Sequence, residues 1–282
     1  MDTVPEIVPV GIDCGAVPSL QFGAVAILDA LGFKGVWDGG KAESVLLGLR
    51  ELTAALESFE RGPDEFDPFT ETRIRHFSDT LIIGVVVYSE RLREKNPNLD
   101  EVGFASAQRS VAAMCVAMVC RICAKAIQLA NRAQLPFAYR GAIAAGKFAI
   151  DSTHVIGPAI DNAAESEKLP DAAVVWLTPS ATDLIDELPQ KAADDAPYAE
   201  AARHFVTDAS RVIDYPLPIK GGRELRTVLV NPYWGLAANP RRIVELRTEL
   251  LRTFDRPTID VLIKKQNTEA FLDFIERVSR EP

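Results

Sequence analysis

The segment "AVAILDALGFKG", which spans residues 24–35, limits the folds that are open to this chain. The apolar run from Ala24 to Leu28 is short and continuous, as is typical of a strand buried on both faces. It ends on Asp29, and a turn containing Gly32 follows. A carboxylate at the end of a buried strand either caps the next helix or holds a metal ion.

The composition is that of an ordinary globular protein, and it excludes several classes of function. The chain has 282 residues, 48% hydrophobic and 25% charged, which suffices for one large domain or for a core with an appendage. Its net charge of -9 argues against a general nucleic-acid-binding surface. A few local cations or metal ions would still allow an acidic protein to bind a polyphosphate.

The cysteines and the apolar segments indicate a cytoplasmic protein. Cysteines stand at positions 14, 115, 120 and 123, and no second pair or nearby histidine completes a zinc site with Cys120 and Cys123. We therefore expect buried thiols in a reducing compartment. The short acidic N-terminus is unlike a signal peptide, and Arg121 interrupts the longest apolar stretch, so we expect no membrane contact.

Strand-like and helix-like segments alternate along the chain. The β-rich runs on either side of "FSDT" predict a hairpin with Asp79 at its tip, and Gly221-Gly222 predict the turn of a second hairpin. In chain order we expect a strand at 24–28, a helix at 41–62, a hairpin at 72–88, a helix at 104–133, strands and turns at 137–157, a helix from 158, a strand and helix at 172–188, and a hairpin at 214–232. This order implies an α/β (α+β) fold with helices on a mixed sheet.

After Pro240 the composition changes, and two amphipathic helices are predicted at 241–254 and 268–281. Phe271, Phe274, Ile275 and Val278 form one stripe of the second helix. We expect a main domain at 18–234 and a C-terminal helical extension at 235–282. The extension packs either on the core or on a second subunit.

Two acids stand where strands end, Asp29 after the first strand and Asp79 on the hairpin. In a ferredoxin-like arrangement the first strand lies beside the hairpin, so both carboxylates can reach one small volume. Hard oxygen ligands on rigid strands suit Mg²⁺ or Mn²⁺, which also take substrate phosphates and water as ligands. Either aspartate alone is a common cap or turn residue. The pair, in this strand order, favours a metal site.

Five stretches, in order, resemble the signatures of class III nucleotidyl cyclases. "AVAILDALGFKG" is similar to the first, and "RHFSDTLIIGV" is similar to the second, in which an aspartate sits on the hairpin. "YRGAIAAGKFAI", "HVIGPAIDNAAESEK" and "PLPIKGGRELRTVLV" resemble the third, fourth and fifth. Together they cover about residues 24–232. The resemblance implies a ferredoxin-like catalytic domain that cyclises a nucleoside triphosphate and releases pyrophosphate.

Carried over to this sequence, the resemblance implies a two-metal site. Asp29 and Asp79 would hold two Mn²⁺ or Mg²⁺ ions, with the Ala30 carbonyl as a possible further ligand. The family works as a dimer, so the resemblance also implies a homodimer with composite active sites.

The resemblance also assigns residues to the triphosphate. Phe33 and its neighbours would lie along it, and Arg140, which leads the third stretch, and Lys220, in "PIKGG", would contact it. A solvated hairpin residue is the alternative for Lys220.

The chain departs from the family on the helix of the fourth stretch. Members have asparagine and arginine there, which steady the transition state from across the dimer interface, whereas this chain has Asp161 and Glu165. An acid near developing negative charge slows the reaction unless another cation compensates. Asn162 is one position away and could take the asparagine's place.

The positions that select the base also differ from those of known members. Adenine-specific cyclases have a lysine-aspartate pair and guanine-specific ones a glutamate-cysteine pair, whereas this chain has Arg75 and His154. Arg75 only donates hydrogen bonds, which suits O2 of uracil or cytosine, and a neutral His154 suits either base. A hairpin residue and a turn histidine without a role in recognition are the alternatives.

This pocket is similar to that of the pyrimidine cyclases of the Pycsar antiphage systems. The similarity implies that UTP or CTP is converted to cyclic UMP or cyclic CMP, a second messenger sensed by a separate effector. Two alternatives stay open: an adenylate cyclase with an unusual pocket, and a noncatalytic nucleotide-binding or dimerisation module. "GAIAAGKF" at 141–148 is close to a Walker A loop, but Phe148 replaces the hydroxyl that would hold Mg²⁺.

Overall fold

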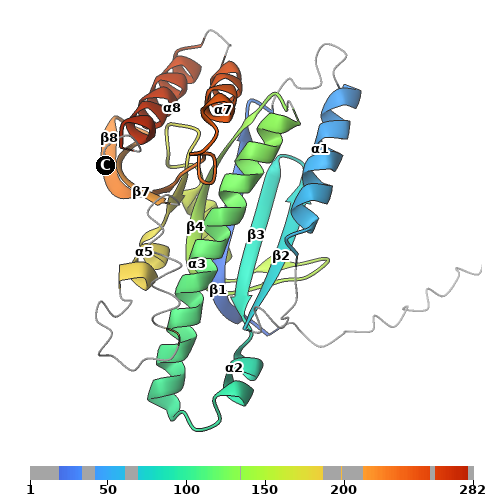
Figure 1. Ribbon diagram of the computed structural model, residues 1–282, viewed down its shortest axis with the longest axis vertical. Helices are drawn as coiled ribbons and strands as arrows, with labels where there is room; N and C mark the ends of the chain where they lie inside the picture. Colours follow the sequence, from blue (N-terminus) through green and yellow to red (C-terminus); the bar gives the residue numbers. More distant parts are fainter. Residues whose placement is uncertain are drawn as a thin grey trace, which may run out of the picture.

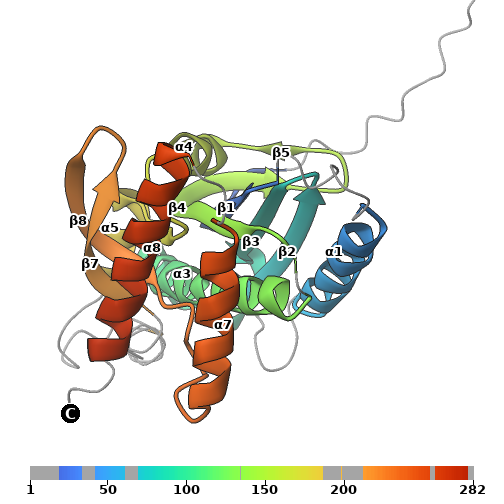
Figure 2. The same ribbon diagram turned by 90° about the horizontal axis from the view of Figure 1, so that it is seen from above.

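A computed structural model describes residues 19–33, 42–60, 69–133, 135–186, 198, 212–254 and 258–278. Within these ranges eight strands form one mixed sheet with helices on both faces, as the sequence predicts (Figures 1 and 2). The strands are β1 (Gln21–Leu31), β2 (Thr70–Phe77), β3 (Thr80–Val87), β4 (Ala138–Ile150), β5 (Val155–Ile156), β6 (Val175–Leu177), β7 (Val212–Ile219) and β8 (Arg223–Val230). The helices are α1 (Ala42–Glu57), α2 (Ser89–Lys95), α3 (Glu101–Arg132), α4 (Pro158–Ser166), α5 (Pro179–Asp186), α7 (Pro240–Arg252) and α8 (Ile259–Val278).

The strand order is β2-β3-β1-β4-β6-β8-β7, and β5 pairs with β4 alone. Strand β1 lies between β3 and β4 and is antiparallel to both, which confirms the predicted buried strand and its position beside the hairpin. Among the strands of the described ranges, only β4 and β6 pair in parallel. Gly141 allows the close approach of β4 to β1, because a Cβ there would lie 2.4 Å from the Ile27 carbonyl oxygen.

Each face of the sheet has its own apolar cluster. The larger one packs α1, α3 and the C-terminal helices on one face, and the smaller one packs α4 on the other through Val25, Ile27 and Ala163 (Figure 2). Because side chains alternate along a strand, Asp29 projects to the same face as Val25 and Ile27. The α4 face therefore carries the candidate site.

Helix α3 is the central helix of the larger cluster (Figure 1). Its N-cap is Asp100, whose carboxylate accepts a hydrogen bond from the Gly103 N–H at 2.7 Å. It is long and apolar enough to cross a membrane by length and composition alone, but most of that stretch is buried inside the protein, as in the core helix of a soluble protein. Its cysteines are free and buried, as predicted, and Cys14 lies outside the described residues.

The two predicted hairpins are confirmed. Ser78 has a positive φ of 57° in the turn that joins β2 to β3, next to Asp79. Gly221 and Gly222 have φ values of 89° and 72° in the turn that joins β7 to β8, a region that favours glycine. The short helix α2 was not predicted, and nearly all of residues 190–210 lie outside the described ranges.

Helices α7 and α8 pack on the core. Leu246, Phe271 and Ile275 belong to the larger apolar cluster, and the Phe271 ring lies 5.0 Å from that of Tyr215 in β7. The Thr268 hydroxyl accepts a hydrogen bond from the Ala173 N–H at 2.9 Å. The sequence left open whether this extension packs on the core or on a second subunit. The structure shows that it packs on the core of its own chain. The domain boundary at 234 stays a prediction.

Candidate active site

Asp29 and Arg140 form a largely buried ion pair at the end of β1. The register of β1 and β4 places the two residues directly opposite each other. An Arg140 Nη2–H donates to Asp29 Oδ2 at 3.0 Å, and the side chains are 7% and 25% exposed. Arg140 contacts only one carboxylate oxygen, and a carboxylate has about four acceptor sites, so Asp29 keeps capacity for a cation.

The hairpin turn with Asp79 lies at the same corner of the sheet. Asp29 pairs with Thr80 across β1 and β3, and the Ala30 N–H donates to the Asp79 carbonyl oxygen at 3.0 Å. The backbones of Ala30 and Asp79, two of the three predicted metal ligands, are thus joined by a hydrogen bond. His76 lies close by: burial lowers its pKa, and the Asp79 charge raises it in part.

The turn after β1 is described only as far as Phe33. The Ala30 carbonyl, a predicted further ligand, accepts a hydrogen bond from the Phe33 N–H at 3.4 Å and has a second lone pair. The Phe33 ring packs edge-on against Phe137 at 5.8 Å, on the rim of the larger cluster. Lys34 and Gly35 of the predicted phosphate-binding turn lie outside the described residues.

Lys220 adds a second cation near Arg140. It sits in the turn between β7 and β8, and its N–H donates to the Leu169 carbonyl oxygen at 3.1 Å. Partial desolvation lowers the pKa of its ammonium group, and the charge of Arg140 lowers it further. Lys264 also lowers the pKa of Lys220, whereas the charges of Asp171 and Glu167 raise it. Lys220 therefore lies within electrostatic reach of Arg140, in a region of mixed charge.

Glu167 is a residue of this site that the sequence analysis missed. It follows α4, is buried, and its Oε1 lies 3.3 Å from Lys168 Nζ. Burial raises the pKa of its carboxyl, and the Asp29 charge raises it further. Among the described residues its Oε2 and Arg140 Nε have no hydrogen-bond partner. Its burial depends on the sheet beneath it, so no local pattern could have identified it.

The raised pKa of Glu167 predicts a pH-dependent stability. A carboxyl whose pKa is higher in the folded state lowers the free energy of unfolding as pH rises from about 4.5 through the raised pKa. Glu167→Gln should therefore be more stable than the wild type near pH 7 and about equal to it below pH 4. Urea unfolding at several pH values measures this, and a variant less stable than the wild type near pH 7 would contradict it.

Helix α4 turns the residues of the fourth stretch toward solvent. It buries Ala159, Ile160 and Ala163 against the sheet. Asp161, Asn162 and Glu165 are exposed on its other side. They are accessible to another molecule, and within this chain they are not drawn into the ion pair at the end of β1.

Arg75 and His154 are brought together, with Asp151 between them. Arg75 in β2 pairs with Ile82 in β3, which in turn pairs with Ile27 in β1. Arg75 therefore lies on the same face of the sheet as Asp29 and two strands away from it, with about 12 Å between the two Cα atoms. Arg75 Nε donates to the Asp151 carbonyl oxygen at 2.9 Å, and Nη1 donates to Glu60 Oε1 at 2.7 Å. The His154 side chain is 65% exposed beside the Asp151 carboxylate.

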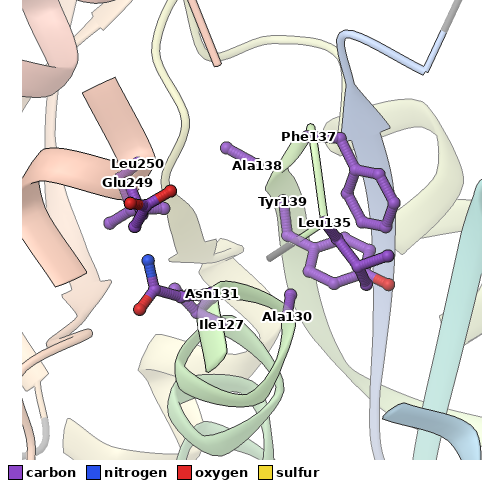
Figure 3. A pocket seen from close by; sticks show the side chains of 9 residues that line it. All are labelled: Ile127, Ala130, Asn131, Leu135, Phe137, Ala138, Tyr139, Glu249 and Leu250. Carbon is purple, nitrogen blue, oxygen red and sulfur yellow. The ribbon is translucent and has the colours of Figure 1, made fainter. Parts of the chain in front are cut away.

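A small pocket of about 10 Å³, part of it open to solvent, lies on the other face of the sheet. It is formed by α3, the start of β4 and α7, and the Asn131 side chain points across it toward Glu249 (Figure 3). Tyr139 lines it and Arg140 does not, because neighbouring residues of β4 face opposite sides. It is therefore separate from the candidate active site.

Within the described ranges no three His, Cys, Asp or Glu side chains are grouped so as to hold a metal ion. The predicted site uses two aspartates and one carbonyl, with substrate and water as the other ligands. No protein-family model and no curated protein matches the sequence.

Proposed function

We propose that the protein is a nucleotidyl cyclase of the class III type, which converts UTP or CTP to the 3′,5′-cyclic monophosphate and pyrophosphate. One observation carries the proposal: the Asp29–Arg140 ion pair lies where the turn of Asp79 meets β1. The strand order β2-β3-β1-β4, with α1 and α3 on one face, is that of a ferredoxin-like unit and agrees with the proposed fold.

Asp29 and Asp79, with the Ala30 carbonyl, suit Mn²⁺ or Mg²⁺, because all three offer hard oxygen ligands at one corner of the sheet. Two such ions, when bound, would lower the pKa of the ribose 3′-OH and offset the charge of the triphosphate. The rigid β1–β3 pairing holds the ligands in place before substrate arrives.

Arg140 and Lys220 would bind the triphosphate, with Phe33 beside it. The 3′-oxygen attacks the α-phosphorus in line, the bond to the β-phosphate oxygen breaks, and the hydroxyl proton passes to solvent. Negative charge develops on the departing pyrophosphate, and the side chains of Arg140 and Lys220 would stabilise it. Arg140 is already desolvated, so its contribution is stronger than that of an exposed cation.

The site would be completed in a homodimer. Asp161, Asn162 and Glu165 are exposed on α4, where a second copy could present them to the triphosphate. In the proposal Asn162 steadies the transition state. Arg75 and His154 bind the base, and the cyclic product acts as a second messenger for a separate effector in antiphage defence.

The test is an assay of purified protein with each of the four nucleoside triphosphates and Mn²⁺. We expect pyrophosphate and a cyclic monophosphate from UTP or CTP. A preference for ATP would instead identify an adenylate cyclase. Binding without any pyrophosphate would identify a noncatalytic nucleotide-binding module, a second candidate that the acids Asp161 and Glu165 on α4 favour.

Lys220→Ala should raise the KM for the nucleoside triphosphate about tenfold, because an ammonium–phosphate contact is lost. Arg223→Ala is the matched control: it removes an exposed cation from the same hairpin. Steady-state kinetics of pyrophosphate release measures both variants. Equal KM values for the two would remove Lys220 from the triphosphate site.

A further inference from the structure

We propose that Asp151 is a positioning residue for base recognition, which holds Arg75 in place and keeps His154 as the Nδ1–H tautomer with an unprotonated Nε2. The inference rests on the proposed function and deepens it. It assigns the hydrogen-bonding pattern that the two side chains present to a pyrimidine.

The Asp151 carboxylate organises the turn between β4 and β5. Its Oδ1 accepts hydrogen bonds from the Thr153 N–H at 2.6 Å, the Thr153 hydroxyl at 2.9 Å and the His154 N–H at 2.6 Å. The Asp151 N–H donates to the His154 carbonyl oxygen at 2.9 Å, which closes the turn. These bonds, led by the Thr153 N–H, hold the pKa of Asp151 well below its ordinary value, so the carboxylate stays ionised and only accepts.

The backbone of Asp151 fixes Arg75 on the neighbouring strand. Its carbonyl oxygen accepts from Arg75 Nε, and Glu60 Oε1 and the Ile74 carbonyl oxygen accept from Arg75 Nη1. Among the described residues no partner contacts Arg75 Nη2, which leaves its N–H groups for a ligand. One residue thus touches both side chains that are proposed to read the base.

The tautomer of His154 follows from the single proton of the Thr153 hydroxyl. That proton is donated to the Asp151 carboxylate, because a charged acceptor makes the stronger hydrogen bond. The Thr153 oxygen, 2.7 Å from His154 Nδ1, must then accept from it. Asp151 Oδ2, at 3.4 Å from Nδ1, also only accepts. Both neighbours therefore favour a proton on Nδ1 and leave Nε2 as an acceptor.

The site then offers guanidinium N–H donors from Arg75 and one imidazole acceptor from His154. A base that matches this pattern has an oxygen or nitrogen acceptor for Arg75 beside an N–H donor for His154. The N3–H of uracil beside its carbonyls, and the amino group of cytosine beside N3 and O2, both provide this pattern.

The experiment compares Asp151→Asn and Thr153→Val with Ser152→Ala, a control at an exposed position in the same turn. In Asp151→Asn an amide donor can replace the carboxylate oxygen beside Nδ1, and Thr153→Val removes the hydroxyl. Two-dimensional ¹⁵N NMR of the whole protein near pH 8 reports the tautomer. The chain has three histidines, and His154→Asn identifies the signals of His154.

We expect Nδ1–H in the wild type and in Ser152→Ala, and a shift toward Nε2–H in the other two variants. KM for the preferred nucleotide should rise about tenfold in those two, with kcat within about twofold, because one hydrogen bond to the base is lost. An Nε2–H tautomer in the wild type, or a changed tautomer with unchanged KM, would overturn the inference. If no nucleotide is turned over, the proposed function fails, and the NMR result alone decides the role of Asp151 in positioning His154.

Discussion

If the protein is the proposed cyclase, Asp29→Asn should lower nucleotide cyclisation with Mn²⁺ by about a thousandfold or more, because a neutral amide is a poor ligand for a divalent cation and cannot help to position the triphosphate. Asparagine is the informative substitution, since its oxygen can still accept from Arg140. Alanine would leave the guanidinium buried without its partner, which costs about 3–5 kcal/mol in such pairs. A loss of activity in the alanine variant could therefore result either from the missing metal ligand or from unfolding.

The assay for this variant is pyrophosphate release, accompanied by circular dichroism to check the fold and by light scattering to check the proposed dimer. Asp183→Asn, on the exposed side of α5, is the matched control and should retain full activity. If Asp29→Asn keeps more than about a tenth of the wild-type rate, far above what loss of an essential electrostatic group leaves, the two-metal assignment is wrong.

Phe271→Ala is expected to lower the free energy of unfolding by about 3–5 kcal/mol, because it removes a large ring from a site that cannot fully collapse. Phe271 is 1% exposed and packs against Tyr215, so its loss separates α8 from the end of the sheet. Urea denaturation measures the change. The control is Val278→Ala on the same helix, at a side chain that is 42% exposed, where a change below about 1 kcal/mol is expected.

The same variant tests whether α8 unfolds separately from the rest of the chain. If residues 235–282 were an independent appendage, Phe271→Ala would affect only α8, and the main transition would stay at the same urea concentration. A single cooperative transition that shifts as a whole would instead show that the helices and the sheet unfold together.

Local patterns in the sequence determined most of the elements. The run from Ala24 to Leu28 reads as a buried strand because apolar clusters cover both faces of β1. Helix α3 follows from long apolar periodicity. The turns at Ser78-Asp79 and Gly221-Gly222 join strands that pair directly. Each of these signals lies within a few consecutive residues, so the sequence alone is sufficient.

The meeting of distant side chains depends on the assembly of the whole sheet. Asp29 and Arg140 are 111 positions apart, and the register of β1 against β4 pairs them. The burial of Glu167 and the contact between Arg75 and Asp151, 76 positions apart, likewise depend on how the whole sheet is assembled. Secondary structure follows from local spacing and turn chemistry. Ion pairs and buried charges follow instead from strand register and packing, which no single segment encodes.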